Sequence, residues 1–209
     1  MPPVTAQTTE FLTTYLNDRV KRLHRAISLR EDDSTLALAS FVERYVELAP
    51  EFITAFENFL AFTDINGEIA QQISTAKEFL ESPASLVSPQ EGLEANMYQA
   101  YLTHRLLEEL NDLLFSHYNC SVIPVDMTRS NLIIHHLIGE PFANQIDNAI
   151  QLLSNKLAKS IQGDTTLSGK LQAYTNQLGT DPIDRHPCLT DSSQISLLFK
   201  SQNTRIRLH

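Results

Sequence analysis

Apolar side chains recur every three or four residues along most of the chain, which is the spacing of one face of an α-helix. In the first such segment, Leu12, Leu16, Leu23 and Ile27 follow this spacing. Prolines, glycines and short polar turns interrupt the pattern repeatedly. The pattern predicts helices over approximately residues 8–29, 34–48, 50–60, 68–80, 88–117, 128–138, 141–161 and 164–178.

Two helix boundaries are predicted from strong local signals. Ser88, Pro89 and Glu91 have the order of a capping box with proline at the first helical position, and they predict the start of a helix that reaches His117. At 1.5 Å per residue this helix is roughly 42 Å long, and we expect it at the centre of the fold. Pro50 is predicted to end one helix and to begin the next.

The connections between the predicted helices are short. Residues 64–67 (Asp-Ile-Asn-Gly) predict a turn, residues 119–125 an extended connector or very short strand, and residues 139–141 a break. Joints of two to eight residues are typical of a single helical bundle. We therefore expect an all-α fold, a single-domain irregular helical bundle of about six to eight helices within residues 1–180. Residues 181–209 are predicted to form a loop and docking arm over the bundle or across a dimer, with 195–199 as a short helix or strand.

Charge is distributed unevenly along the 209 residues and changes the expected partners. The net charge is −9, and residues 31–118 carry sixteen acidic and three basic side chains, a net charge of −13. An acidic surface of this kind repels phosphate groups, so nucleic acid and anionic membranes are unlikely partners. Residues 1–30 carry five basic and two acidic side chains, and we expect them to form a solvated helix end or to contact the acidic middle of the chain.

Composition and cysteine usage predict a folded cytoplasmic protein. The hydrophobic fraction of 42% is high enough for a core, and no run of 18 apolar residues predicts a membrane-spanning helix. Cys120 and Cys188 have no CxxC spacing, so a disulfide framework is not expected. The first residues show no basic stretch followed by an apolar segment, so no secretory signal is predicted.

One face of the predicted 88–117 helix combines aromatic and charged side chains. The leucines at 102, 106, 110, 113 and 114 define its buried side, and no lysine occurs between Lys77 and Lys156. Two interpretations stay open: an ordinary solvated face, or a strip that lines a polar cavity or binds a partner. The strip consists of Glu94, Tyr98, Tyr101, Arg105, Glu108 and Asp112.

Two His-x-x-x-Glu pairs suggest a metal site. His104 with Glu108, and His136 with Glu140, have the i, i+4 spacing that shares one helix face. On facing helices these four side chains would surround one divalent transition metal and support hydrolytic or oxidative chemistry. The competing interpretation is that such pairs arise by chance, with His104 at the flank of the buried side, Glu108 nearly opposite it, and His136 half-buried.

The familiar catalytic signatures are absent, which favours a non-catalytic function. The sequence contains no GxxxxGK[ST], GxSxG, HExxH or GxGxxG motif. We therefore expect a cytoplasmic, non-catalytic helical protein that acts through protein–protein interaction, including self-association as a homodimer, or through small-ligand binding. The alternative is a metal-dependent helical-bundle enzyme that uses the two His-x-x-x-Glu pairs.

Overall fold

The computed structural model describes residues 16–17, 27–29, 34–81, 93–178, 187–189 and 195–197. This part of the chain is mostly helical, as the periodicity predicted, with one short pair of strands. The elements in chain order are β1 (Ile27–Leu29), α2 (Ser34–Thr63), α3 (Glu68–Glu81), α4 (Leu93–Tyr118), α5 (Thr128–Ile138), α6 (Phe142–Ile161), α7 (Thr165–Leu178) and β2 (Ile195–Leu197).

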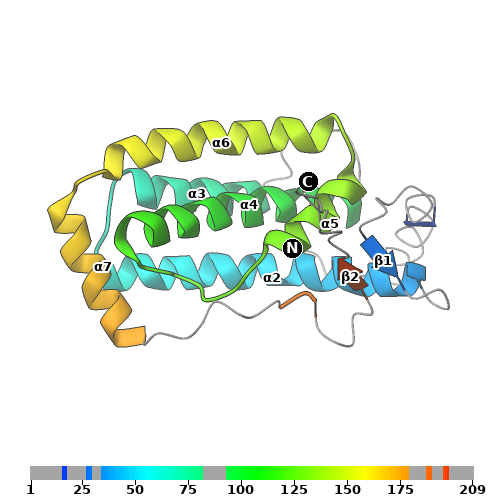
Figure 1. Ribbon diagram of the computed structural model, residues 1–209, viewed down its shortest axis with the longest axis horizontal. Coiled ribbons are helices and arrows are strands. Elements are labelled where there is room, and N and C mark those ends of the chain that lie inside the picture. The colour runs from blue at the N-terminus through cyan, green and yellow to red at the C-terminus, as the bar shows by residue number, and fades with distance from the viewer. Residues whose placement is uncertain are drawn as a thin grey trace, which may run out of the picture.

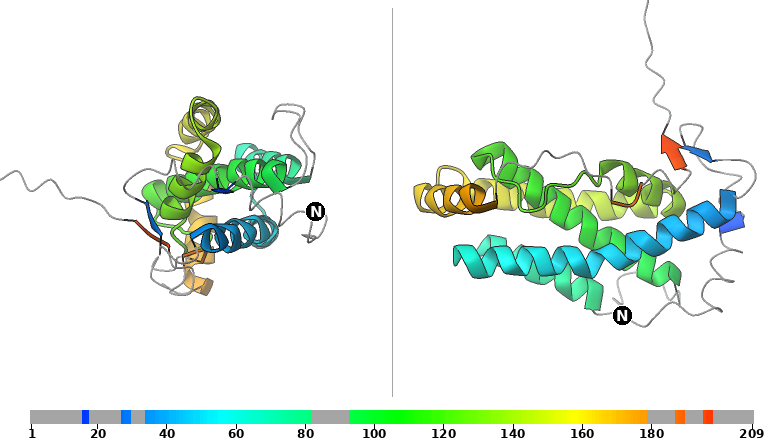
Figure 2. Two further views of the ribbon diagram at one scale, coloured as in Figure 1. Left: turned by 90° about the vertical axis from the view of Figure 1, so that its right-hand side faces the viewer. Right: turned by 90° about the horizontal axis from the view of Figure 1, so that it is seen from below.

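The long helices run lengthwise and surround α4. Figure 1 shows α2, α3, α4 and α6 along the long axis, with α7 across one end and the two strands at the other. Helix α4 contacts α2, α3, α5, α6 and α7, and the end-on view in Figure 2 shows it between α2 and α6. Because neighbours cover α4 on several sides, it buries polar as well as apolar positions.

Helix α2 continues through Pro50, so the predicted helix boundary at this residue is wrong. Pro50 is exposed, while Ala49 and Ile53 beside it are buried in the core. An interior proline removes one backbone hydrogen bond and costs about 3 kcal/mol. The apolar face continues without a shift on both sides of Pro50, and its burial outweighs that local cost.

Helices α3, α5, α6 and α7 begin and end close to their predicted positions, and α4 ends at Tyr118, next to the predicted end at His117. The turn before α3 is confirmed, with positive φ angles of 49° at Asp64 and 78° at Gly67. Helix α5 begins where expected, and the Asp126 carboxylate accepts the backbone N–H of Thr128 at 2.8 Å. The capping box at residues 88–91 lies outside the described residues, which resume at 93.

The strands join segments from opposite ends of the chain. Strands β1 and β2 are antiparallel, with Ile27 opposite Leu197 and Leu29 opposite Ile195. The predicted helix over 8–29 is therefore wrong at its last three residues, whereas the predicted short element at 195–199 contains a strand. Local periodicity does not reveal a distant pairing partner. Leu16 and Asn17 are helical, and the rest of 8–29 lies outside the described residues.

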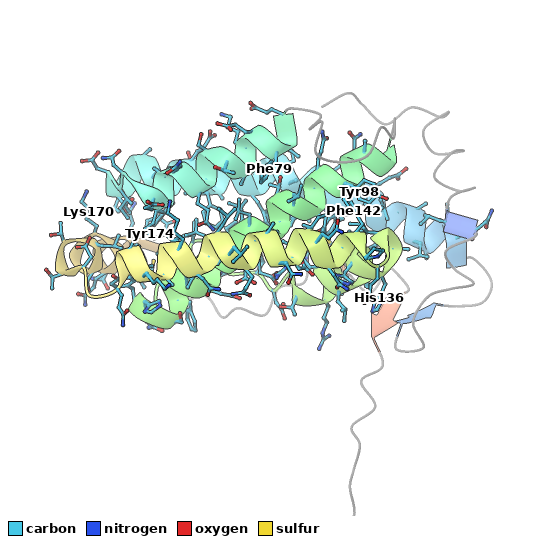
Figure 3. The ribbon with its side chains drawn as sticks, turned by 90° about the horizontal axis from the view of Figure 1, so that it is seen from above. Phe79, Tyr98, His136, Phe142, Lys170 and Tyr174 are labelled. Atoms are coloured by element: carbon cyan, nitrogen blue, oxygen red, sulfur yellow. The ribbon has the colours of Figure 1, made fainter. Side chains whose placement is uncertain are left out.

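Aromatic contacts fix α7 against the end of α2. The Tyr174 ring lies 4.9 Å from the Phe59 ring and 5.7 Å from the Phe62 ring, measured between centroids. The Lys170 ammonium group donates to the backbone oxygen of Asp64 in the α2–α3 turn. Figure 3 shows Lys170 and Tyr174 at this end of the molecule. Within the described residues, no helix has the length and apolar character needed to cross a membrane.

Candidate ligand-binding site

A pocket of about 160 Å³ lies between α2, the C-terminal half of α4, the 119–127 connector and the start of α5. In Figure 1 this connector runs back along α4 toward α5. Its residues Ile123, Val125 and Met127 are part of the pocket lining. The larger part of the lining surface is apolar, although six of the thirteen lining residues are polar or charged. The lining residues are Phe52, Phe56, His104, Leu107, Glu108, Asn111, Asp112, Phe115, Ile123, Val125, Asp126, Met127 and Thr128.

His104 is the most deeply buried polar residue of this pocket, with 1% of its surface exposed. Its Nε2 lies 2.8 Å from the backbone oxygen of Tyr45, in the turn of α2 that precedes Pro50. Because a carbonyl oxygen only accepts, Nε2 carries the proton and donates it. Burial lowers the pKa of His104 to about 4, although the bond to Tyr45 opposes this effect. At neutral pH the ring is therefore neutral, and its Nδ1 is an acceptor.

The Nδ1 of His104 has no hydrogen-bond partner among the residues that the structure describes. The ring is packed between aromatic groups, 4.4 Å from the Tyr45 ring and 5.0 Å from the Phe52 ring, which meets it edge-on at 86°. A buried acceptor without a partner costs about 1–3 kcal/mol. An occupant of the pocket that donates a hydrogen bond to Nδ1 removes this cost.

Three carboxylates lie around the pocket and differ in their partners. Glu108 accepts from Arg105 and, at 2.7 Å, from the Asn131 amide. Asp126 accepts the first N–H of α5. Asp112 forms no ion pair with any described residue, and partial burial together with Glu108 raises its pKa to about 6. Asp112 is therefore the carboxylate that is free to bind a cation.

Asn111 holds the connector that forms the pocket wall. Its Oδ1 accepts the backbone N–H of Val122 at 2.8 Å and that of Ile123 at 3.2 Å, and the Ser121 hydroxyl at 3.3 Å. Asn111 is itself buried in the middle of α4, where asparagine is a weak helix former. The Asn111 side chain thus satisfies backbone N–H groups of the connector that no helix or sheet would satisfy.

Arg105 is the centre of a polar network beside the pocket. Its guanidinium group donates to Glu108, to Glu109 at 2.8 Å and to Asp147 on α6 at 3.3 Å. Burial alone would lower the pKa of Arg105, but the surrounding carboxylates outweigh burial and hold this pKa above its usual range. Arg105 therefore keeps its positive charge and holds α4 against α6.

Two tyrosine hydroxyls extend this network to α5 and α2. Tyr101 donates to Asp147 at 2.8 Å and lies 3.1 Å from Nδ1 of His135, which is also 2.9 Å from Asp147. Tyr45 donates to the Asn131 oxygen at 2.5 Å. Burial raises the pKa of both phenols, so they remain neutral donors. The network joins four helices through side chains that are mostly shielded from water.

The structure places most of the predicted strip inside the protein. Tyr98 and Tyr101 are 4% and 1% exposed, and the Tyr98 ring meets the Phe142 ring of α6 at 5.4 Å, side by side with it in Figure 3. The interpretation of these positions as an ordinary solvated face is therefore wrong. The cause is that α5 and α6 of the same chain cover this side of α4. Asp112 is exposed at the pocket, and nothing is described of the Glu94 side chain.

The two His-x-x-x-Glu pairs have different surroundings. His104 and Glu108 line the pocket, and the structure corrects the positions expected for both: His104 is fully buried, and Glu108 is largely buried. His136 packs against the His135 ring at 5.9 Å, and Glu140 is exposed in the turn after α5. Figure 3 shows His136 near the beginning of α6. Among the described residues, no three His, Cys, Asp or Glu side chains are grouped to hold a metal ion.

Several residues of the site were not predicted from the sequence. Asn111, Asn131, His135 and Asp147 belong to the pocket wall or the network, and they come from three helices. Of these four residues, only Asn111 has a signal in the sequence. It lies within a predicted helix, where an asparagine side chain often bonds to nearby backbone groups. The other partners follow from the packing of α5 and α6.

The fold and the site define a mainly helical protein with a largely apolar pocket beside a buried ionic network. No protein-family model matches the chain, and no significant match was found among curated proteins or among solved structures. Its function is therefore inferred from the chemistry of the pocket.

Proposed function

We propose that this is a non-catalytic, ligand-binding helical protein that takes a small, mainly apolar molecule into the pocket between α2 and α4. The observation that carries this proposal is the unpartnered Nδ1 of His104, a buried acceptor in the lining of a largely apolar pocket. Small-molecule sites typically combine apolar walls with a few polar groups that orient the ligand. A pocket of about 150 Å³ is large enough for one benzene-sized ring.

The surrounding structure supports a preformed pocket. Asn111 fixes the connector on one side, and the bond from His104 to Tyr45 fixes the ring at the inner end. The first anchor ties the connector back to the helix that precedes it, and the second joins two helices that are distant in the sequence. Because such walls are already rigid, the protein loses less conformational entropy when a ligand binds.

The test is a ¹H–¹⁵N NMR titration of the full chain with phenol, which combines an aromatic ring with a hydrogen-bond donor. We expect saturable shifts at Leu107, Ile123 and Met127, and their loss in a Val125→Phe variant that fills the pocket. Leu152→Ala serves as the control, because Leu152 is 72% exposed on α6 and is not part of the lining. Absence of saturable shifts at the lining residues, with phenol and with toluene, contradicts the proposal.

We further infer that residues 1–180 form one domain organised around α4, with residues 181–209 docked on it as an arm. The contacts of α4 with every other described helix support this organisation. We also place the protein in the cytoplasm, since Cys120 and Cys188 are both unpaired thiols. Limited proteolysis tests the domain assignment: cleavage near residue 180 should leave a stable fragment, and progressive degradation would contradict it.

Self-association is a second candidate, supported by an apolar pair on the outer side of α6. Leu152 and Leu153 are 72% and 42% exposed. A homodimer that covers them should dissociate in a Leu152→Glu variant, while Leu36→Glu, at an exposed leucine of α2, should leave the oligomeric state unchanged. Sedimentation velocity measures both variants, and a monomeric parent protein at high concentration contradicts this candidate.

A further inference from the structure

The two polar ends of the pocket differ in depth. His104 is buried at the inner end, whereas Asp112 and Phe115 are exposed and mark the mouth. The two polar residues are eight positions apart on α4, so the helix separates them by roughly 12 Å at 1.5 Å per residue. A single polar group on a small ligand therefore does not reach both ends. A ligand that binds both His104 and Asp112 needs two polar groups joined by an apolar body.

The inner end requires a hydrogen-bond donor from its ligand. The proton on His104 is committed to the carbonyl oxygen of Tyr45, so Nδ1 presents a lone pair. A hydroxyl or N–H group satisfies this lone pair. A carbonyl or ether oxygen would instead leave two acceptors facing each other without a proton between them.

The outer end favours a cation over an anion. Glu108 is engaged by Arg105 and Asn131, and Asp126 by the start of α5, which leaves Asp112 without an ion pair among the described residues. None of the described residues that line the pocket is a lysine or an arginine. A ligand carboxylate or phosphate would meet carboxylates alone, whereas an ammonium group would pair with Asp112.

The walls between the two ends fit an aromatic ring. Phe52, Phe56 and Phe115 line the pocket together with Leu107 and Met127. Aromatic rings gain from edge-to-face contacts with such side chains. Phe115 at the mouth is 45% exposed and lies three residues after Asp112 on α4. An aromatic ring at this position is able to contribute a cation–π contact.

We propose that the pocket binds an arylalkylamine whose ring carries a hydroxyl or N–H donor at the end opposite the amine. The donor bonds to Nδ1 of His104, the ring lies between the phenylalanine side chains, and the ammonium group pairs with Asp112 at the mouth. This assignment rests on the proposed function and adds the ligand class to it.

The experiment is isothermal titration calorimetry of the full chain with three matched probes. Tyramine has both polar groups, tyrosol replaces the ammonium group with a hydroxyl, and phenethylamine lacks the ring hydroxyl. We expect tyramine to bind at least about tenfold more tightly than either of the others, because tyrosol lacks the positive charge that pairs with Asp112 and phenethylamine lacks the donor for Nδ1 of His104. Asp112→Asn should reduce tyramine affinity by about tenfold and leave tyrosol unchanged.

The controls separate this assignment from the proposed function. Glu78→Gln makes the same charge change on α3, which contributes no residue to the pocket, and it should bind tyramine as the parent does. Circular dichroism shows that both variants are folded. Equal affinity for tyramine and tyrosol overturns the ammonium assignment while pocket binding stands, and equal affinity for tyramine and phenethylamine overturns the role of His104. Failure of all three probes, together with phenol, overturns the pocket itself.

Discussion

The Nε2 of His104 lies 2.8 Å from the backbone oxygen of Tyr45, and this bond leaves Nδ1 as an unpaired acceptor on a residue that lines the pocket. The bond joins the buried centre of α4 to the turn of α2 before Pro50. Pro50 has no N–H to donate to the backbone oxygen of Val46, four residues earlier, so this part of α2 has one backbone bond fewer than a regular helix. His104 therefore links the fold of α2 to the chemistry of the site.

The free energy of unfolding should decrease as the pH is lowered from about 6.5 to about 4, partly because of His104. Burial lowers the pKa of this residue to about 4, so over that range the unfolded chain binds a proton that the folded protein excludes. The loss corresponds to about 3 kcal/mol. Urea unfolding of the parent and of His104→Phe at both ends of this range measures it, and NMR titration of the ring should show no protonation near pH 6. An equal loss in both proteins contradicts the prediction.

Asp112→Asn should stabilise the folded protein at neutral pH. Partial burial and the neighbouring Glu108 and Glu109 raise the pKa of Asp112 to about 6, so its charge opposes folding fully above about pH 6, and this effect is lost as the pH falls to about 4. Because the side chain is exposed, solvent screening limits the gain to about 1 kcal/mol. Urea unfolding should show this gain at neutral pH and none at about pH 4. A gain that is the same at both pH values would point to packing instead.

Arg105→Met should destabilise the protein by about 3 kcal/mol, since it leaves Glu108, Glu109 and Asp147 without their shared cation in a mostly buried position. Adding Asp147→Asn to this variant removes one of the unpaired charges. The double variant should therefore lose less unfolding free energy than the sum of the losses of the two single variants. We expect this difference, the coupling energy, to be about 1 kcal/mol. Chemical denaturation of the four proteins in this cycle measures the coupling, and strictly additive losses would show that the network is not coupled.

Asn111→Ala should loosen the wall of the pocket. The variant leaves the buried N–H groups of Val122 and Ile123 without an acceptor, which we expect to cost about 2 kcal/mol. Hydrogen exchange should accelerate at these two amides. Ser121→Ala is the matched control, because it removes a hydroxyl that bonds to Asn111 and to the backbone oxygen of Ile123 and keeps both amide bonds. Unchanged exchange in Asn111→Ala would show that the connector is held by other contacts.

Cys120 and Cys188 should react slowly with a disulfide reagent in the native state. Both thiols are buried, and burial raises the pKa of Cys188 to about 12 and that of Cys120 above its usual range. Since the thiolate is the reactive form, labelling requires an opening of the structure. Labelling with Ellman's reagent with and without urea measures this, and rapid native reaction at either cysteine contradicts the prediction.

The strip on α4 shows how far local pattern identified the site. Tyr98, Tyr101, Arg105 and Glu108 were grouped from helical spacing, and the structure brings them together on the side that faces α5 and α6. Whether that side met water or protein was not determined by spacing, because periodicity identifies the faces of a helix and not their neighbours. Asp147, which completes the network, could not be assigned to it before α6 was placed.

The sequence by itself determined the helices from α3 to α7, their main boundaries and the acidic character of the middle of the chain. These properties depend on side-chain spacing, on turn residues such as Gly67 and on charge, which are local or additive. The tertiary structure decided the continuity of α2 through Pro50, the pairing of β1 with β2, and the pocket. Each of these results from apolar burial or hydrogen bonding between segments distant in sequence, and those contacts outweigh local preferences of a few kcal/mol.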